Sequence, residues 1–160
     1  RRPQTYVIDE FSSIVFRYEG GAMTIELPSG RKLFYPSARL SSRTISGANG
    51  EFDVQDISYM GQEQTTGKWA KLHTYGGKLT ENVVQAISRD LLANAIFKVF
   101  DMGYNIVLHV HDEIAAEIPK DGNEELTLNA MIDAMCDAPN WAANIPLRAA
   151  GYITEYYKKD

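Results

Sequence analysis

The sequence predicts an α+β fold: a mostly antiparallel sheet with one long amphipathic helix and a second, shorter helix. Three observations predict it. Short β-type runs alternate with turn residues over residues 12–59, and apolar residues recur at helical spacing over residues 79–101. A pair of apolar runs then flanks two adjacent acids, as in a hairpin. The helices are expected to pack on one side of the sheet.

Turn residues divide the first half of the chain into short strands. The β-type runs cover residues 14–18, 23–27 and 32–35. Gly20-Gly21 separates the first pair and Pro28-Ser29-Gly30 the second, and both are sequences typical of turns. An antiparallel meander is therefore expected. Residues 41–50 are rich in Ser, Gly and Asn, which predicts an exposed loop.

The long helix is predicted over residues 79–101, because apolar residues keep a helical period there and Gly103 stands where such a helix would end. Residues 104–111 and 114–118 then alternate in the manner of two strands and form a predicted hairpin.

A second helix is expected to begin after Asn123, whose side chain is suited to cap it, and to end near Pro139. Two acids in its first turn favour the same start, since the positive end of the helix dipole lies there. A last strand is predicted over residues 147–157.

Length and composition bound the class of protein. With 160 residues, 44% hydrophobic and 23% charged, the chain is predicted to form one folded domain over residues 1–160. It holds no apolar run of the roughly 20 residues that a membrane span needs, so a cytoplasmic protein is expected. The net charge of −5 argues against a free-standing nucleic-acid binder. However, the negative charge is concentrated in the second half of the chain. Residues 1–80 hold ten Lys/Arg and eight Asp/Glu, whereas residues 81–160 hold six Lys/Arg and thirteen Asp/Glu.

Two adjacent acids, Asp112 and Glu113, occupy the predicted tip of the hairpin. A two-residue hairpin loop prefers Asn-Gly or Asp-Gly, and neighbouring carboxylates repel each other. A divalent cation would turn that repulsion into coordination, and Mg²⁺ suits hard oxygen ligands. The residues alone leave two interpretations open: a Mg²⁺ site, or a solvated turn with His109 and His111 as cross-strand partners.

His111-Asp112-Glu113 between apolar strands resembles motif C of family A DNA polymerases. Residues 74–92 resemble the helix that precedes this motif in the phage-type branch of the family, and residues 27–31 and 141–157 are similar to the same branch. The resemblance covers residues 14–160 and implies the C-terminal part of a polymerase palm, with motif C at residues 111–113.

The resemblance also implies a reaction and its participants. A primer 3′-hydroxyl would attack the α-phosphate of a deoxynucleoside triphosphate with two metal ions assisting. Asp112 would bind Mg²⁺, Glu113 would lie close with a lesser role, and His111 would touch the primer end. Gln85 would read the minor groove, where all base pairs present acceptors. The implied partners are primer–template DNA and dNTPs, in a phage-infected or prophage-bearing bacterial cell.

The predicted long helix carries a polar stripe formed by Lys78, Asn82, Gln85 and Arg89. Their spacing of four, three and four places them on one face of a helix, where they could donate to phosphates and base edges. A solvated helix face explains the same pattern, and the resemblance favours DNA contact for Gln85 above the others. Glu81 stands where relatives often have Asn.

A complete family A site needs more than motif C. It needs a second aspartate from motif A and a fingers helix, and no such helix is found in this sequence. Residues 10–17 are superficially similar to motif A, but Glu10 stands where Asp is required. The missing fingers and motif A segments of a parent polymerase are therefore implied partners, and the chain alone is expected to be inactive.

Two other functions are compatible with the residues. A metal-dependent nuclease or phosphohydrolase could also use adjacent acids with a nearby histidine, and three or more carboxylates around one ion would favour it. A non-catalytic, DNA-binding prophage remnant would bind DNA in a salt-sensitive way without incorporating nucleotides.

Overall fold

The computed structural model describes residues 4–7, 13–47 and 50–157. The described residues contain two α-helices and three antiparallel sheets, which confirms the predicted α+β class. The chain divides into two compact units, residues 1–86 and 87–160, and each is described by itself. One domain over residues 1–160 stays a prediction.

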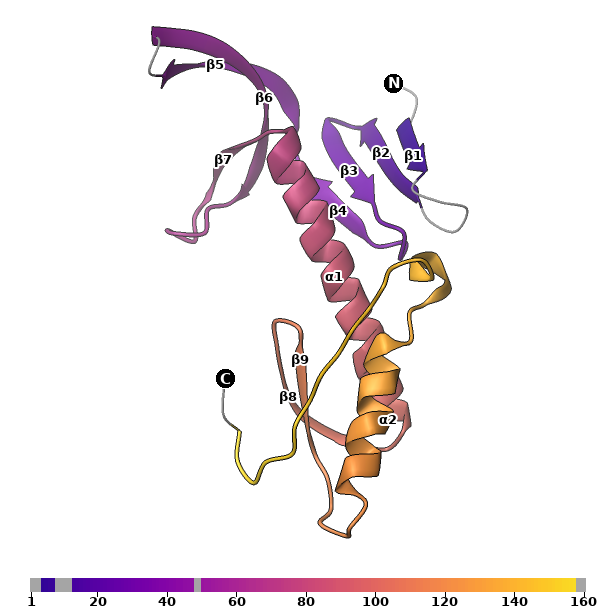
Figure 1. Ribbon diagram of the computed structural model, residues 1–160. Helices are drawn as coiled ribbons and strands as arrows, with labels where there is room; N and C mark the ends of the chain where they lie inside the picture. Colours follow the sequence, from indigo (N-terminus) through magenta and orange to yellow (C-terminus); the bar gives the residue numbers. More distant parts are fainter. Residues whose placement is uncertain (1–3, 8–12, 48–49, 158–160) are drawn as a thin grey trace. The chain divides into compact units, whose positions relative to one another are not determined.

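The first sheet of residues 1–86 is an antiparallel meander in the order β1-β2-β3-β4 (Figure 1). Its strands are β1 (Gln4–Val7), β2 (Ser13–Glu19), β3 (Ala22–Glu26) and β4 (Lys32–Tyr35). The turn between β2 and β3 holds Gly20 and Gly21 at φ of 58° and 79°, a region that glycine adopts without strain. The predicted meander is confirmed. Glu10 lies outside the described residues.

The second sheet shows that the loop predicted over residues 41–50 is wrong. Its strands are β5 (Arg39–Gly47), β6 (Gly50–Gln62) and β7 (Trp69–Thr74), and β5 pairs with β6 along its whole length. Cross-strand hydrogen bonds between polar side chains stabilise this ribbon. Thr44 Oγ1 donates to Asp53 Oδ1 over 2.7 Å, for example.

Helix α1 (Gly76–Asp101) begins within residues 1–86 and packs there on the sheets. Arg31 Nη2 donates to the carbonyl oxygen of Ala86 over 2.8 Å, and the Tyr35 and Tyr59 rings meet edge to face with centroids 5.1 Å apart. Among the described residues of this unit, the buried apolar ones are Ile25, Leu27, Tyr35, Ala38, Leu79, Val83 and Ala86. These residues form the core that fixes the start of α1.

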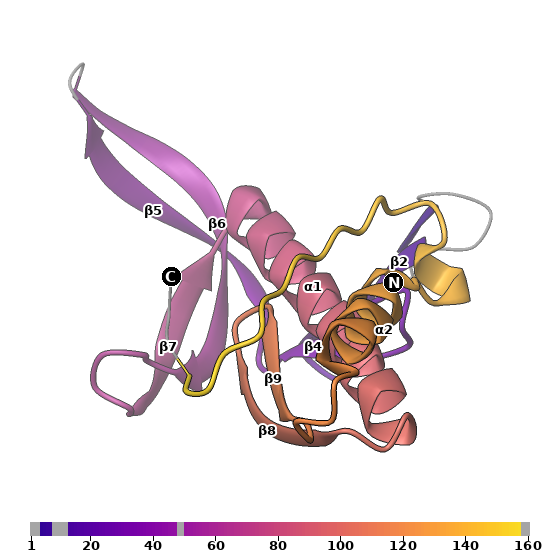
Figure 2. The same cartoon turned by 60° about the horizontal axis from the view of Figure 1, so that its bottom comes forward.

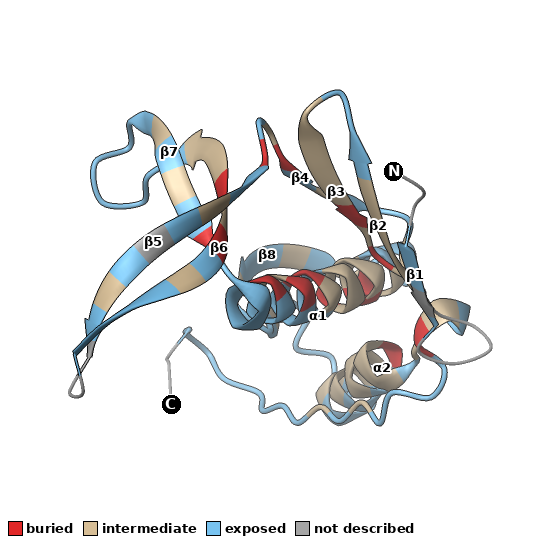
Figure 3. Cartoon of the chain, turned by 90° about the horizontal axis from the view of Figure 1, so that it is seen from above, coloured by how far each residue is buried: buried red, intermediate tan, exposed pale blue. Residues whose placement is uncertain are grey.

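In residues 87–160, the second half of α1 is followed by β8 (Asn105–Val110), β9 (Glu113–Glu117), α2 (Glu124–Cys136) and the short 3-10 helix η1 (Asn140–Ala142). Buried residues here include Leu92, Ala95 and Val99. Figure 3 shows buried positions in red along α1. The predicted hairpin and both predicted helices are confirmed. None of the described helices is long and apolar enough to cross a membrane.

Asn123 occupies the N-cap position of α2, as predicted, but its side chain makes no capping hydrogen bond. Instead, the Asn123 N–H donates to Asp121 Oδ1 over 2.9 Å. The helix ends at Cys136, before Pro139, in agreement with the prediction.

The last strand, predicted over residues 147–157, is wrong: this segment is extended but belongs to no sheet (Figure 2). An extended segment becomes a strand only when its backbone groups pair with a neighbour, and in the described part of the chain β8 and β9 pair with each other alone. Side chains hold the segment instead. Lys120 Nζ lies 2.8 Å from Glu155 Oε1.

Candidate hairpin site and helix stripe

The hairpin of β8 and β9 presents the motif at its tip. Because Val110 pairs with Glu113, the two turn residues are His111 and Asp112. The predicted tip is therefore corrected by one position, since Glu113 is the first residue of β9 and not part of the turn. All three motif residues are exposed.

His111 adopts a left-handed backbone with φ of 52°. A two-residue hairpin turn requires a positive φ at its first position, which glycine normally supplies. For a residue other than glycine, the left-handed backbone conformation costs roughly 1–2 kcal/mol of conformational free energy. The chain thus has a strained histidine at a position where glycine would adopt the same backbone conformation without this penalty. Backbone strain of this kind is often found at functional sites.

Tyr157 contacts the motif directly. Its hydroxyl donates to Glu113 Oε2 over 3.2 Å, and the two residues are 44 positions apart in the sequence. Local desolvation, this hydrogen bond and the negative charge of Glu113 together raise the pKa of Tyr157 above its ordinary value. The phenol therefore remains a donor at neutral pH. No sequence pattern links Tyr157 to the hairpin, and sequence analysis assigned it no role.

Asp112 and Glu113 are the carboxylates at the hairpin tip that could bind a metal ion. Their carboxylates are hard oxygen donors, and Mg²⁺ is commonly held by one or two carboxylates together with substrate phosphates. In the part of the chain that the structure describes, no three His, Cys, Asp or Glu side chains gather as a metal-binding group. The two acids fit Mg²⁺ as a partial ligand set that phosphate oxygens or other carboxylates would complete.

Glu81 engages two of the predicted DNA-binding side chains on α1. Lys78 Nζ lies 2.9 Å from both carboxylate oxygens of Glu81, and Gln85 Nε2 donates to Glu81 Oε1 over 3.2 Å. The hydrogen bond to Glu81, with its charge, raises the pKa of Lys78. Lys78, Gln85 and Arg89 are exposed, as a polar stripe requires.

Asn82, the remaining member of the stripe, has a structural contact. Its Nδ2 donates to the hydroxyl of Tyr35 over 3.0 Å, and Tyr35 is only 5% exposed. Burial, opposed by this hydrogen bond, raises the pKa of Tyr35. Asn82 therefore satisfies a buried hydroxyl.

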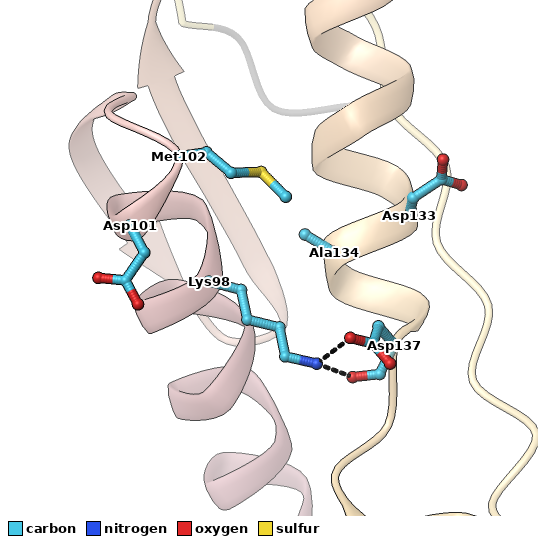
Figure 4. Close-up of a pocket in the computed structure, with 6 residues that line it drawn as sticks. All are labelled: Lys98, Asp101, Met102, Asp133, Ala134 and Asp137. Carbon is cyan, nitrogen blue, oxygen red and sulfur yellow. Dashed lines mark hydrogen bonds and ion pairs between the residues drawn. The ribbon is translucent and has the colours of Figure 1, made fainter.

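A pocket of about 460 Å³ lies between the end of α1 and α2 (Figure 4). Lys98 crosses it to bind the carboxylate and the carbonyl oxygen of Asp137. The pocket is lined by Lys98, Asp101, Met102, Asp133, Ala134 and Asp137. None of these is a predicted site residue, so this pocket is distinct from the hairpin tip.

Comparison with known proteins gives the motif its context. Over 147 residues, 92% of its length, the chain is 40% identical to a protein named DNA polymerase from Bacillus phage SP02. The chain is similar to a phage DNA polymerase. It spans 21% of the length of that polymerase. No protein-family model matches the chain, and no solved structure matches it.

Proposed function

We propose that this chain is the C-terminal palm part of a family A DNA-directed DNA polymerase and that His111-Asp112-Glu113 is its motif C. The observation that carries the proposal is an exposed, strained hairpin tip with adjacent acids, in a chain 40% identical to a phage DNA polymerase. The similarity supports a polymerase, and the hairpin supports the place of the motif within it.

Each motif residue has a role in this proposal. Asp112, exposed in the turn, supplies a carboxylate ligand for Mg²⁺, and Glu113 stands beside it with one oxygen held by Tyr157. Bound Mg²⁺ would supply positive charge to the phosphates of the nucleotide. His111 contacts the primer terminus from the first position of the turn. Tyr157 orients Glu113 without touching the substrate.

Helix α1 would contact the primer–template duplex through its polar stripe. Gln85 donates to the acceptors that every base pair presents in the minor groove, and Lys78 and Arg89 approach phosphates. Glu81 holds Lys78 and Gln85 before DNA binds. DNA phosphates compete with the Glu81 carboxylate for these donors. The free energy needed to break the contacts of Lys78 and Gln85 with Glu81 therefore reduces the net binding free energy.

Two-metal catalysis needs carboxylates that clamp both attacking and leaving oxygens. In this proposal the second aspartate and the fingers segment that grips the dNTP belong to a longer protein, and that protein acts in the bacterial cytoplasm. The 160-residue chain is then inert by itself.

A primer-extension assay with Mg²⁺ tests the proposal on three proteins: the 160-residue chain, the longer protein that carries it, and Asp112→Asn of the longer protein. We expect extension by the longer protein alone, with a loss of at least about 10²-fold on substitution, since a metal ligand acts on the transition state. Asp101→Asn, which removes an exposed acid at the end of α1, is the matched control and should retain activity. Extension by the 160-residue chain, or near-normal activity of Asp112→Asn, would contradict the proposal.

A further inference from the structure

One face of the second sheet gathers cations and an aromatic ring. Side chains alternate across a sheet, so residues in register share a face. Arg39 and His73 flank Ser58 from β5 and β7, and along β7 Lys71 and Trp69 follow on the same face, opposite Met60 and Gln62. We name the face formed by Arg39, Trp69, Lys71 and His73 the basic face.

The basic face is open to solvent. Arg39 and Lys71 are exposed, His73 has a side chain 38% exposed, and Trp69 is 65% exposed. Trp69, Lys71 and His73 lie at alternate positions of an edge strand, about 6.8 Å apart if each residue rises about 3.4 Å. The edge therefore carries a regular row of an aromatic ring, the cation of Lys71 and an imidazole ring.

No exposed acid of the described strands shares the basic face. Among the described residues of the three strands, Asp56 is the one acid on the basic face, and it is 4% exposed. His73 Nδ1 lies 2.9 Å from Asp56 Oδ2, and Ser41 Oγ donates to the other carboxylate oxygen. Because Nδ1 is engaged, the Nε2 edge of the His73 ring is turned away from Asp56.

The opposite face explains why the basic face looks outward. Ile57, Tyr59 and Leu72 lie on that other face, and the Tyr59 ring packs on Tyr35. The exposed acids Glu51 and Asp53 also fall on it by register. The exposed acids and the ring that packs on Tyr35 are thus on one side of the sheet, and Arg39, Lys71 and Trp69 are on the other.

We infer that the basic face binds single-stranded DNA, with phosphates on Arg39 and Lys71 and an unpaired base stacked on Trp69. Cationic grooves with exposed aromatic rings are the common way to bind single strands, because every base has a stacking face and every linkage a phosphate. A duplex would leave Trp69 unused, since its bases are already stacked. The inference rests on the proposed function for the identity of the strand, an unpaired stretch of template.

Fluorescence anisotropy with a labelled oligo-dT of about 16 nucleotides, the upper end of typical site sizes, tests the inference on the 160-residue chain. Trp69→Ala should weaken binding about five- to 150-fold, since one stacked base is lost, while Trp69→Phe keeps most of the affinity. Arg39→Ala and Lys71→Ala should each lower the slope of log K against log salt by about one. These exposed positions permit folding, which thermal melting checks.

Lys120→Ala is the matched control, since it removes the same charge from a lysine side chain that is 82% exposed and lies outside the second sheet. Intrinsic fluorescence gives a second readout. Stacking should quench Trp69, and the quenching should vanish in Trp69→Phe, where Trp141 is the remaining tryptophan. Quenching that survives in Trp69→Phe, equal losses from Lys120→Ala and Lys71→Ala, or tighter binding of duplex than of oligo-dT would overturn the inference.

The two proposals fail separately. The oligonucleotide assay needs no catalysis. If the chain does not bind oligo-dT, the further inference fails, but the primer-extension test of the longer protein is unaffected. Conversely, if the longer protein does not extend a primer, the Trp69→Ala and Lys71→Ala affinities still decide whether the basic face binds single-stranded DNA.

Discussion

The Tyr157 hydroxyl donates to Glu113 Oε2 over 3.2 Å and so attaches the C-terminal segment to the strand that carries the second motif acid. This segment has no backbone pairing with β8 or β9 in the described residues. Its position beside the hairpin therefore depends on side-chain contacts, and the Tyr157 contact reaches the motif itself.

Tyr157→Phe should loosen the C-terminal segment at neutral pH. The pKa of Tyr157 is raised above its ordinary value of 10.0, so the protonated phenol is the form that the folded state prefers. Its stabilisation is present in full below pH 10.0 and is lost as the pH rises through the folded-state pKa. Chymotryptic cleavage in the C-terminal segment should be faster in Tyr157→Phe than in wild type at pH 8. Tyr156→Phe, which removes the neighbouring hydroxyl, should cleave at the wild-type rate, and equal rates for both variants would contradict the prediction.

His111→Gly should preserve or raise stability while it weakens primer contact. Glycine removes a left-handed penalty of roughly 1–2 kcal/mol and adds about 0.5–1 kcal/mol of backbone entropy cost, so a net gain of up to about 1.5 kcal/mol is expected. Urea denaturation measures it. His109→Gly should destabilise the hairpin instead, because His109 lies in strand β8 and glycine within a strand weakens it. A destabilised His111→Gly would show that the turn does not strain His111.

Sequence periodicity predicted the elements that bury an apolar face. The helix over residues 79–101 was predictable because residues such as Val83 and Val99 repeat at helical spacing and are buried. The β5–β6 hairpin was missed for the opposite reason. Residues 41–47 of β5 are almost all polar or glycine, as in the contact of Ser46 with Glu51, so that strand shows no apolar alternation to detect.

The site was only partly predictable for two physical reasons. Turn register depends on which backbone can take a positive φ, and the choice of His111 over glycine broke the usual rule, so the tip was placed one residue late. The contact of Tyr157 with Glu113 joins residues far apart in sequence, which local patterns do not encode. By contrast, the spacing of Glu81 from Lys78 and Gln85 held a usable signal, because side chains three and four positions apart meet on a helix.

Asn82→Ala should destabilise residues 1–86 by about 1–3 kcal/mol, because it leaves the buried Tyr35 hydroxyl without its amide donor. Tyr35→Phe should cost less, about 0.5–1.5 kcal/mol, since Asn82 is only partly buried and its amide can reach water. Urea denaturation of both variants and of the double variant measures the coupling. Asn129→Ala, at an exposed position of α2, is the control for loss of an amide on a helix. Additive effects of Asn82→Ala and Tyr35→Phe would show that the two side chains do not interact.

Glu81→Asn should strengthen binding to primer–template duplex. The substitution removes the carboxylate that holds Lys78 and Gln85, so both donors become available to phosphate and to base edges. The released Lys78 should steepen the dependence of log K on log salt by about one, because one more phosphate is neutralised. Anisotropy titrations of a labelled duplex at several salt concentrations measure both effects. Glu125→Gln makes the same change of net charge on α2 and controls for general electrostatics. If Glu81→Asn and Glu125→Gln raise affinity equally, or if Lys78→Ala leaves the gain from Glu81→Asn intact, the polar stripe of α1 is a solvated helix face and not a DNA-binding surface.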